Sequence, residues 1–209
     1  DHVPHARAAD GSVIPAVIDD AVGLFWVPRD TTGVGINSRL LADNTSHANI
    51  SLTGVEVAQS QLLGTGDEVI EAFEIALDYA QTLTAAYLCG LMTETFDTTI
   101  DYMRTRKQFG RAIGSFQGLQ HRAVDLYIAK ELARSVVTHV VRSIESIDRP
   151  SERTLLVSRA VFRSTSSALR ITREAIQMHG AIGFTDECDI GHYLNRAMVL
   201  GSRRGNTSW

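Results

Sequence analysis

Residues 66–149 contain no proline, and their apolar side chains recur at steps of three and four residues. Proline interrupts helices because it lacks a backbone N–H and its ring clashes with the preceding turn, so its absence over this length favours long helices. Ile70, Phe73 and Leu77 begin the pattern, which is typical of an amphipathic helix. The sequence therefore predicts one unusually long helix over about residues 66–104.

The rest of the chain keeps this helical character. Val124, Ile128 and Leu132 recur at steps of four, and Ser151 is a natural N-cap directly after a proline. Further helices are predicted over about residues 116–147, 151–179 and 186–200. Four helices joined by short connections are typical of an antiparallel bundle.

The first 63 residues have a different pattern. Prolines stand at positions 4, 15 and 28, and short runs of β-branched and aromatic residues are separated by turn residues such as Asp and Gly. Such runs predict short strands joined by turns. We therefore expect residues 1–63 to form a β segment and residues 64–209 to form the helical bundle.

Charge is distributed unevenly along the chain. Residues 1–103 carry 3 basic and 15 acidic side chains, and residues 104–209 carry 17 and 9, so net charges of −12 and +8 sum to −4. A basic half indicates an anionic partner, either a phosphate-bearing cofactor or a nucleic acid. The basic residues are mostly arginines along helical patterns without interleaved aromatic residues, so no nucleic-acid partner is expected.

Several classes of protein are disfavoured. No run approaches the roughly 20 apolar residues that a membrane-spanning helix needs, and no basic-then-apolar leader is present, so we expect a cytoplasmic protein without a membrane partner. Cys89 and Cys188 lack the spacing of a zinc site or a disulfide framework, and no HExxH motif appears, so no metal is expected. The sequence has no nucleophile-elbow motif, so Ser-His-Asp catalysis is not expected.

The stretch MRTRKQFGRAIGSFQGLQHR holds the first candidate site. Four basic residues surround a predicted helix end and a glycine turn before a new helix begins: Arg104, Arg106, Lys107 and Arg111. Helix N-termini and converging guanidinium groups both favour phosphate oxygens, and Phe109 could present a flat face to a planar ring. The alternative is that Phe109 and Phe116 are core residues at a turn and that the arginines form a solvated face.

The stretch AIQMHGAIGFTDE holds a second candidate turn after a predicted helix. Gly180 and Gly183 would allow the backbone to approach another group closely. The alternative is a helix C-cap followed by a plain connector.

Together, TRKQFGRAIGSFQGLQHRAVDL, AIQMHGAIGFTDE and YLNRA resemble the acyl-CoA dehydrogenase family. Members of that family have an N-terminal helical domain, a middle β domain and a C-terminal four-helix bundle. VPHARAADGSVIPAV and GVEV resemble the second part of the middle domain. The resemblance thus implies a mainly α chain, with a C-terminal antiparallel four-helix bundle preceded by part of a β-barrel-like middle domain.

The resemblance also implies FAD bound between neighbouring subunits. In the family, the arginine of the RxxFG motif contacts the pyrophosphate, its aromatic partner and a later glutamine lie near the cofactor, and a Q-x-x-G-G turn reaches the adenosine end. Ala181 replaces the second glycine of that turn. The cofactor-binding residues implied here are Arg106, Phe109, Gln117, Gln177, Gly180, Ala181 and Thr207.

The chemistry implied is α,β-dehydrogenation of an acyl-CoA thioester, in which a glutamate removes the α proton and the flavin accepts hydride. Most members carry this glutamate in a late E-G-T motif, where Gly205 stands here. Others carry it on the first bundle helix, where Ala80 stands beside Gln81. Neither base is present, so no catalytic residue is assigned. Asp78 is retained and is expected to contact the CoA portion of the substrate.

A third departure concerns the flavin-contacting tryptophan and threonine of the family, which correspond to His2 and Pro4. The three departures lead to a hypothesis. The chain resembles the non-catalytic partner in a heteromeric enzyme of the steroid type, in which a homologous acyl-CoA dehydrogenase subunit supplies the glutamate.

Three alternatives stay open. The chain could be a self-sufficient homotetrameric dehydrogenase whose base is Asp78, Glu74 or Glu94. It could be an oxidase or another flavoenzyme with the same fold. It could also be a helical scaffold of this fold without flavin.

Overall fold

A computed structural model of the chain describes residues 3–18 and 20–202. The chain divides into two compact units, Asp1–Leu77 and Asp78–Trp209. Helix α1, Asp67–Thr105, runs through this division. The predicted boundary after residue 63 stays a prediction.

The first unit contains two small antiparallel sheets. One has the strand order β1-β5-β4 and the other β2-β3-β6. Their bounds are β1 Val3–Pro4, β2 Gly11–Ile18, β3 Ala21–Pro28, β4 Val34–Leu40, β5 Ser46–Leu52 and β6 Leu62–Thr65. The pairing of β3 with β6 shifts register between Leu24 and Phe25. Val27 of β3 and the consecutive residues His47 and Ala48 of β5 are almost fully buried in this unit.

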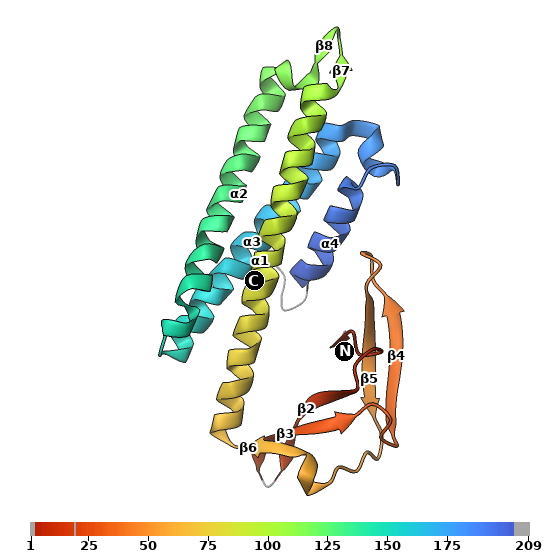
Figure 1. The fold of residues 1–209 in the computed structure, drawn as a ribbon, viewed down its shortest axis with the longest axis vertical. Helices are drawn as coiled ribbons and strands as arrows, with labels where there is room; N and C mark the ends of the chain where they lie inside the picture. Colours follow the sequence, from red (N-terminus) through yellow and green to blue (C-terminus); the bar gives the residue numbers. More distant parts are fainter. Residues whose placement is uncertain (1–2, 19, 203–209) are drawn as a thin grey trace. The chain divides into compact units, whose positions relative to one another are not determined.

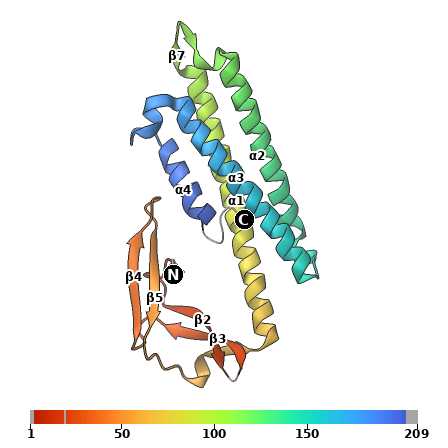
Figure 2. The same ribbon diagram turned by 180° about the vertical axis from the view of Figure 1, so that it is seen from behind.

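The second unit is the helical bundle. After α1 come a small hairpin, β7 Lys107–Gln108 and β8 Arg111–Ala112, and then α2 Gln117–Ser143, α3 Pro150–His179 and α4 Ile190–Ser202. The helices run alternately in opposite directions (Figures 1 and 2). The acidic side chains of Asp67 and Glu68 lie in the first turn of α1, where they interact favourably with the positive end of the helix dipole and stabilise the helix. The predicted mainly α fold with an antiparallel four-helix bundle is confirmed.

All four helices contribute to the bundle core. Leu88 and Met92 of α1 pack in one cluster with Leu126 of α2, Ile171 of α3 and Leu200 of α4. Leu88, Met92 and Ile171 have no exposed surface. Burying such side chains contributes roughly 1.5–3 kcal/mol each, so this cluster holds the four helices together.

Two predicted helix ends differ from the structure. The second helix stops at Ser143, and residues 144–146 form a tighter 3₁₀ turn. The hydroxyl groups of Ser143 and Ser146 donate hydrogen bonds to carbonyl oxygens of preceding turns, and such bonds compete with regular helix geometry. The last helix begins at Ile190 because residues 185–189 form a turn in which Thr185 accepts a bond from the Cys188 N–H.

Cys89 lies within the bundle and should be a slow nucleophile. Burial raises the pKa of its thiol from 9.0 to about 11, and the positive charge of Arg134 offsets part of this effect. Because the thiolate is the reactive form, a thiol reagent at pH 8 should label Cys89 in the folded protein far more slowly than after unfolding in urea. Its labelling rate should rise as the pH approaches 11.

A Cys89→Ser variant provides the control, since the remaining labelling then belongs to Cys188. Equal rates for Cys89 in the folded and unfolded protein at pH 8 would contradict this prediction.

None of the described helices is both long and apolar enough to cross a membrane.

Candidate functional site

A tight hairpin follows α1 and carries most of the first candidate motif. In its two strands Lys107 pairs with Ala112 and Gln108 with Arg111, which leaves Phe109 and Gly110 as a two-residue loop. Both loop residues have positive φ, 54° and 79°. Positive φ at both positions is the mark of a type I′ turn, the connection that best matches strand twist.

The hairpin presents Phe109 outward. The Phe109 side chain is 89% exposed, and its ring meets the Phe116 ring edge-on with centroids 6.1 Å apart. The Arg111 guanidinium lies 4.1 Å from the Phe116 centroid on the ring face, a cation–π contact. The alternative in which Phe109 is a core residue is therefore wrong, and Phe116 is the half-buried member of the pair.

Two cations beside the hairpin are free to bind an anion. Arg104 is paired with Asp101 at 3.2 Å, but Arg106 and Lys107 form no ion pair within residues 3–18 and 20–202. Both are exposed, as is Gln117 at the start of α2. Guanidinium and ammonium donors are the groups that proteins use for phosphate, so this donor set fits the pyrophosphate of a dinucleotide.

The second candidate turn ends α3. Gly180 adopts φ 68° and ψ −141°, and its N–H donates to the carbonyl oxygens of Gln177 and Ile176. Gln177, Gly180 and Ala181 are exposed. Gly183 is buried, and a Cβ there would lie 2.9 Å from the Ile176 carbonyl oxygen. The turn is a helix C-cap, as one alternative proposed, and it also exposes the predicted binding residues.

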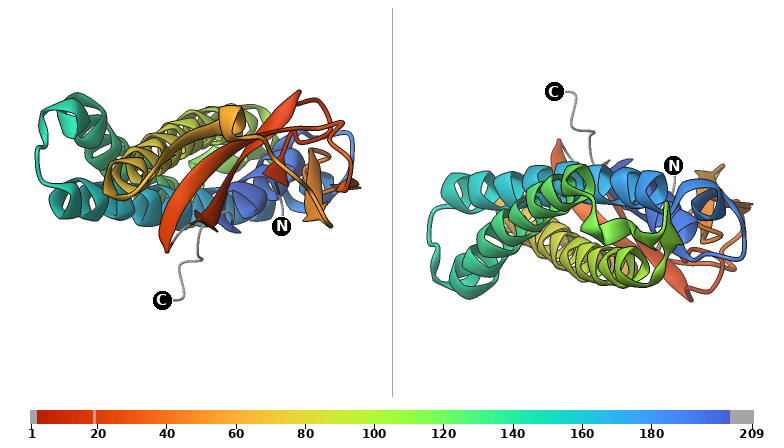
Figure 3. Two further views of the ribbon diagram at one scale, coloured as in Figure 1. Left: turned by 90° about the horizontal axis from the view of Figure 1, so that it is seen from below. Right: turned by 90° about the horizontal axis from the view of Figure 1, so that it is seen from above.

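Tyr102 and His179 bring the two turns together. The Tyr102 ring stacks on the His179 ring at 4.3 Å between centroids, and the Tyr102 hydroxyl donates to the His179 carbonyl oxygen at 3.2 Å. Both turns consequently lie at the same end of the bundle, the near end in the right-hand view of Figure 3. The contact joins residues 77 positions apart, and no local sequence pattern marks Tyr102.

Gly180 should resist substitution. A Cβ at this positive φ would be strained, so we expect Gly180→Ala to lower the free energy of unfolding by about 1–3 kcal/mol. The matched control is Gly90→Ala on α1, where no atom lies within 4 Å of an added Cβ and where alanine should stabilise the helix by roughly 0.5–1 kcal/mol. Urea unfolding followed by circular dichroism measures both, and a neutral Gly180→Ala would contradict the expected strain.

Asp78 lies far from the two turns. It precedes Tyr102 by 24 positions on α1, which corresponds to about 36 Å along a helix. Its carboxylate oxygen accepts hydrogen bonds from Arg153 Nε and Thr154 Oγ1, each at 3.1 Å. The Asp78 and Arg153 side chains are only 4% and 8% exposed. Sequence reasoning missed Arg153, since nothing near position 153 indicates its partner on another helix.

Some predicted residues fall outside the part of the chain that the structure describes. They are Thr207, which was expected to bind the cofactor, the Gly205 position of the missing base, and His2. Pro4 lies in β1 and is exposed. Ala80, the other position of the missing base, is exposed on α1. Among the described residues, no group of His, Cys, Asp and Glu is arranged to hold a metal ion.

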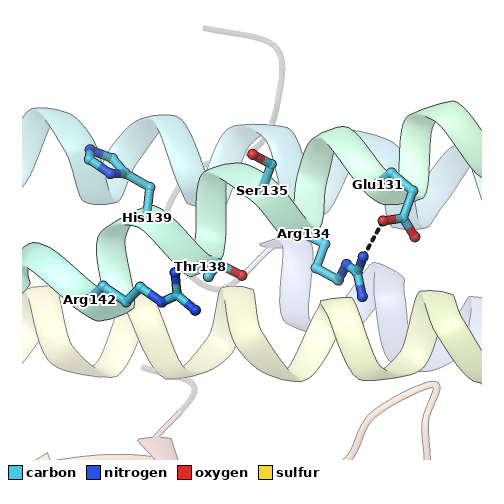
Figure 4. Close-up of a pocket in the computed structure, with 6 residues that line it drawn as sticks. All are labelled: Glu131, Arg134, Ser135, Thr138, His139 and Arg142. Atoms are coloured by element: carbon cyan, nitrogen blue, oxygen red, sulfur yellow. Dashed lines mark hydrogen bonds and ion pairs between the residues drawn. The ribbon is translucent and has the colours of Figure 1, made fainter.

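A polar groove of about 610 Å³ runs along α2 (Figure 4) and was not predicted. Its lining residues are Glu131, Arg134, Ser135, Thr138, His139 and Arg142. Arg134 forms an ion pair with Glu131, and no ion pair of Arg142 is found among the described residues. The groove lies on a different part of the bundle from the two turns.

The family model and the relatives that match this chain all come from one protein family. The family model described as the C-terminal domain of acyl-CoA dehydrogenase matches residues 70–208. Acyl-CoA dehydrogenase IpdE2 of Mycolicibacterium smegmatis is 42% identical over 120 residues, which cover 57% of this chain and 36% of that protein. The probable acyl-CoA dehydrogenase YngJ of Bacillus subtilis is 29% identical over 89% of this chain and 49% of its own length. This chain thus spans half or less of the length of these two curated relatives.

Solved structures share the fold. The ChsE4-ChsE5 complex of Mycobacterium tuberculosis superposes with a TM-score of 0.85 at 24% identity, over 96% of this chain and 54% of that chain. A variant of the Tcur3481-Tcur3483 steroid ACAD superposes with a TM-score of 0.84 at 25% identity, over 99% of this chain and 54% of that chain.

Proposed function

Because this chain belongs to the acyl-CoA dehydrogenase family, we propose that it is a flavoprotein subunit that takes part in the α,β-dehydrogenation of an acyl-CoA thioester. The observation that carries the proposal is the pair of turns at one end of the bundle, joined by Tyr102 and His179. One turn offers unpaired cations and an exposed aromatic ring. The other offers an exposed glycine backbone next to a glutamine side chain.

In the proposed flavin site, Arg106 holds the pyrophosphate of FAD, and Phe109 and Gln117 lie near the cofactor. Gln177, Gly180 and Ala181 face its adenosine end, and Thr207 completes the set. When bound, FAD supplies the redox chemistry by accepting the hydrogen from the β carbon as hydride. The exposure of Arg106, Phe109 and Gln177 supports a site that a neighbouring subunit completes, since FAD in this family lies between subunits.

We further propose that the chain depends on a homologous partner subunit for the catalytic glutamate. Gly205 and Ala80 occupy the two positions where family members carry that base. The two structural relatives named above support this proposal. One is the ChsE4-ChsE5 complex, and the other is the Tcur3481-Tcur3483 steroid ACAD. A steroid-type acyl-CoA is accordingly the proposed substrate class.

The rival proposal is a self-sufficient homotetramer whose base is an acid on α1. Asp78 is a poor candidate, because its carboxylate is buried and engaged by Arg153 and Thr154. A general base must reach the proton that it removes. Glu74 and Glu94 are both exposed and are the acids whose substitution would test this rival.

The test is to express the full-length protein alone and together with the product of its neighbouring gene. Flavin content and dehydrogenation of acyl-CoA thioesters are then measured for both preparations. We expect flavin and activity in the co-expressed complex and no dehydrogenation by the lone protein. Full activity of the lone protein, abolished by Glu74→Gln or by Glu94→Gln, would establish the rival. A colourless complex without flavin would reject both proposals.

A further inference from the structure

Tyr102 lies in the last turn of α1 and makes hydrogen bonds toward both candidate turns. Its carbonyl oxygen accepts a bond from the Arg106 N–H at 2.8 Å, at the point where the helix ends and the hairpin begins. Its hydroxyl donates to the His179 carbonyl oxygen at 3.2 Å. The next residue, Gly180, begins the second turn. One residue thus connects the arginine proposed for the pyrophosphate with the turn proposed for the adenosine end.

His179 gives this contact a firm base on α3. Its side chain is buried, and its Nδ1 donates a hydrogen bond to the Ala175 carbonyl oxygen at 2.8 Å. Its ring stacks on the Tyr102 ring with an angle of 22° between the ring planes. The second turn packs on the same residue, because a Cβ at Gly183 would lie 3.1 Å from the His179 Cβ. A change at the Tyr102 hydroxyl would therefore be transmitted directly to this turn.

The hairpin is attached to the end of α1 in a comparable way. The Arg106 carbonyl oxygen accepts a hydrogen bond from the Ile113 N–H at 2.8 Å. A Cβ at Gly114 would lie 2.9 Å from the Met103 carbonyl oxygen, so the backbone after the hairpin lies close against the helix. Met103 and Ile113 are both buried. The first turn is thus fixed to α1, and the Tyr102 hydroxyl joins the end of α1 to the second turn.

We infer that Tyr102 is a positioning residue of the proposed flavin site, which sets the separation of the two turns. The inference rests on the proposed function, in which one turn binds the pyrophosphate of FAD and the other its adenosine end. A ligand that spans two sites binds more tightly when their separation is already correct, because less ordering is needed on binding. Tyr102 acts through Arg106 and Gly180, since His179 already engages its ring and its hydroxyl.

A positioning role and a merely structural role differ in the ligands that they affect. ADP contains both adenosine and a diphosphate, so it spans the two proposed half-sites as FAD does. Adenosine alone occupies the second half-site, and inorganic pyrophosphate alone occupies the first. The advantage of linking two groups depends on the geometry between their sites. A wrong separation therefore weakens binding of FAD and ADP only, whereas a general loosening of the bundle weakens binding of all four ligands.

Tyr102→Phe tests the inference in the co-expressed complex after removal of the flavin. This variant keeps the ring that stacks on His179 and deletes the hydroxyl. We expect its affinities for FAD and ADP to fall by about 3- to 10-fold, the effect of one ordinary hydrogen bond. Its affinities for adenosine and pyrophosphate should equal those of the wild type. Isothermal titration calorimetry measures all four.

The matched control is Tyr127→Phe on α2. Tyr127 is 49% exposed, and its ring also meets an aromatic ring, that of Phe96, with centroids 5.9 Å apart. It follows Gln117 by ten positions, which corresponds to about 15 Å along the helix. Deleting its hydroxyl should leave all four affinities unchanged.

Two results would overturn the inference while the proposed function stands, because in both the wild-type complex binds FAD. One is an unchanged affinity of Tyr102→Phe for FAD and ADP. The other is an equal loss of affinity for all four ligands, which a merely structural role predicts. A wild-type complex that binds no FAD would reject the proposed function and, with it, this inference.

Discussion

Replacing Arg153 with leucine is expected to lower the free energy of unfolding by about 3–5 kcal/mol, the cost of leaving one member of a buried ion pair without its partner. In the wild-type bundle, Arg153 of α3 holds Asp78 of α1 through Nε at 3.1 Å. Leucine would leave that carboxylate in the interior with the Thr154 hydroxyl as its side-chain donor among the described residues. Urea unfolding followed by far-UV circular dichroism measures the change.

The double variant Asp78→Leu/Arg153→Leu should recover most of this loss. Removing both charges also removes the cost of burying them, and the Nη2 atom of Arg153 is buried without a hydrogen-bond partner in the described structure. A double-mutant cycle should thus give a coupling energy of about 3 kcal/mol or more, the upper end of the usual range of roughly 0.5–3 kcal/mol.

Arg104→Gln is the control for general effects of losing an arginine. Arg104 and its partner Asp101 are both 73% exposed, and surface pairs of this kind contribute about 0.2–1 kcal/mol. An Arg153→Leu variant that is no less stable than Arg104→Gln would show that the buried pair does not hold α1 to α3.

The buried pair also marks the limit of prediction from the sequence. Long helices could be predicted because periodicity and the absence of proline act locally. Asp78 and Arg153 are in contact although they are 75 positions apart in the sequence, and Tyr102 and His179 are 77 positions apart. Neither contact can be predicted from a local sequence pattern, because each depends on how α1 packs against α3, and α2 separates these two helices in the sequence.

The four-residue repeat along α2 illustrates a second limit. Apolar residues recur at positions 124, 128, 132, 136 and 140, but a step of four residues advances about 40° around a helix beyond a full turn. The repeat therefore winds around the helix. Val124 at one end is 55% exposed, whereas Val140 at the other is 1% exposed. The repeat predicted the helix correctly but could not distinguish its buried side from its outer side.

The hairpin after α1 shows what residue types alone indicate about the candidate site. The glycine at position 110 indicated a turn, and the four basic residues around it indicated an anion site. The exposure of Phe109 and the pairing of Arg104 with Asp101 depend on the turn type and on the last turn of α1. Arg104 is paired with Asp101 and Arg111 stacks on Phe116. Of the four basic candidates, Arg106 and Lys107 are thus the ones without an ion pair or ring contact in the described part of the chain.

Arg106→Gln is expected to weaken FAD binding by about 10- to 100-fold, because a hydrogen bond to a charged group contributes roughly 1.5–3 kcal/mol. The arginine is exposed and forms no ion pair among the described residues, so its removal should leave the stability of the bundle nearly unchanged. The measurement is FAD affinity of the co-expressed complex after flavin removal, by fluorescence titration, with thermal unfolding as a parallel check of folding.

Two matched variants decide whether such a loss reflects recognition of the pyrophosphate. Arg106→Lys keeps the positive charge but lacks the planar fork that binds two phosphate oxygens, so it should bind FAD with an affinity between those of wild type and Arg106→Gln. Arg104→Gln removes the same charge two positions away, where Asp101 already neutralises it, and should bind FAD as wild type does. Equal losses in Arg104→Gln and Arg106→Gln would indicate only a general electrostatic effect, and an unchanged affinity in Arg106→Gln would remove Arg106 from the proposed site.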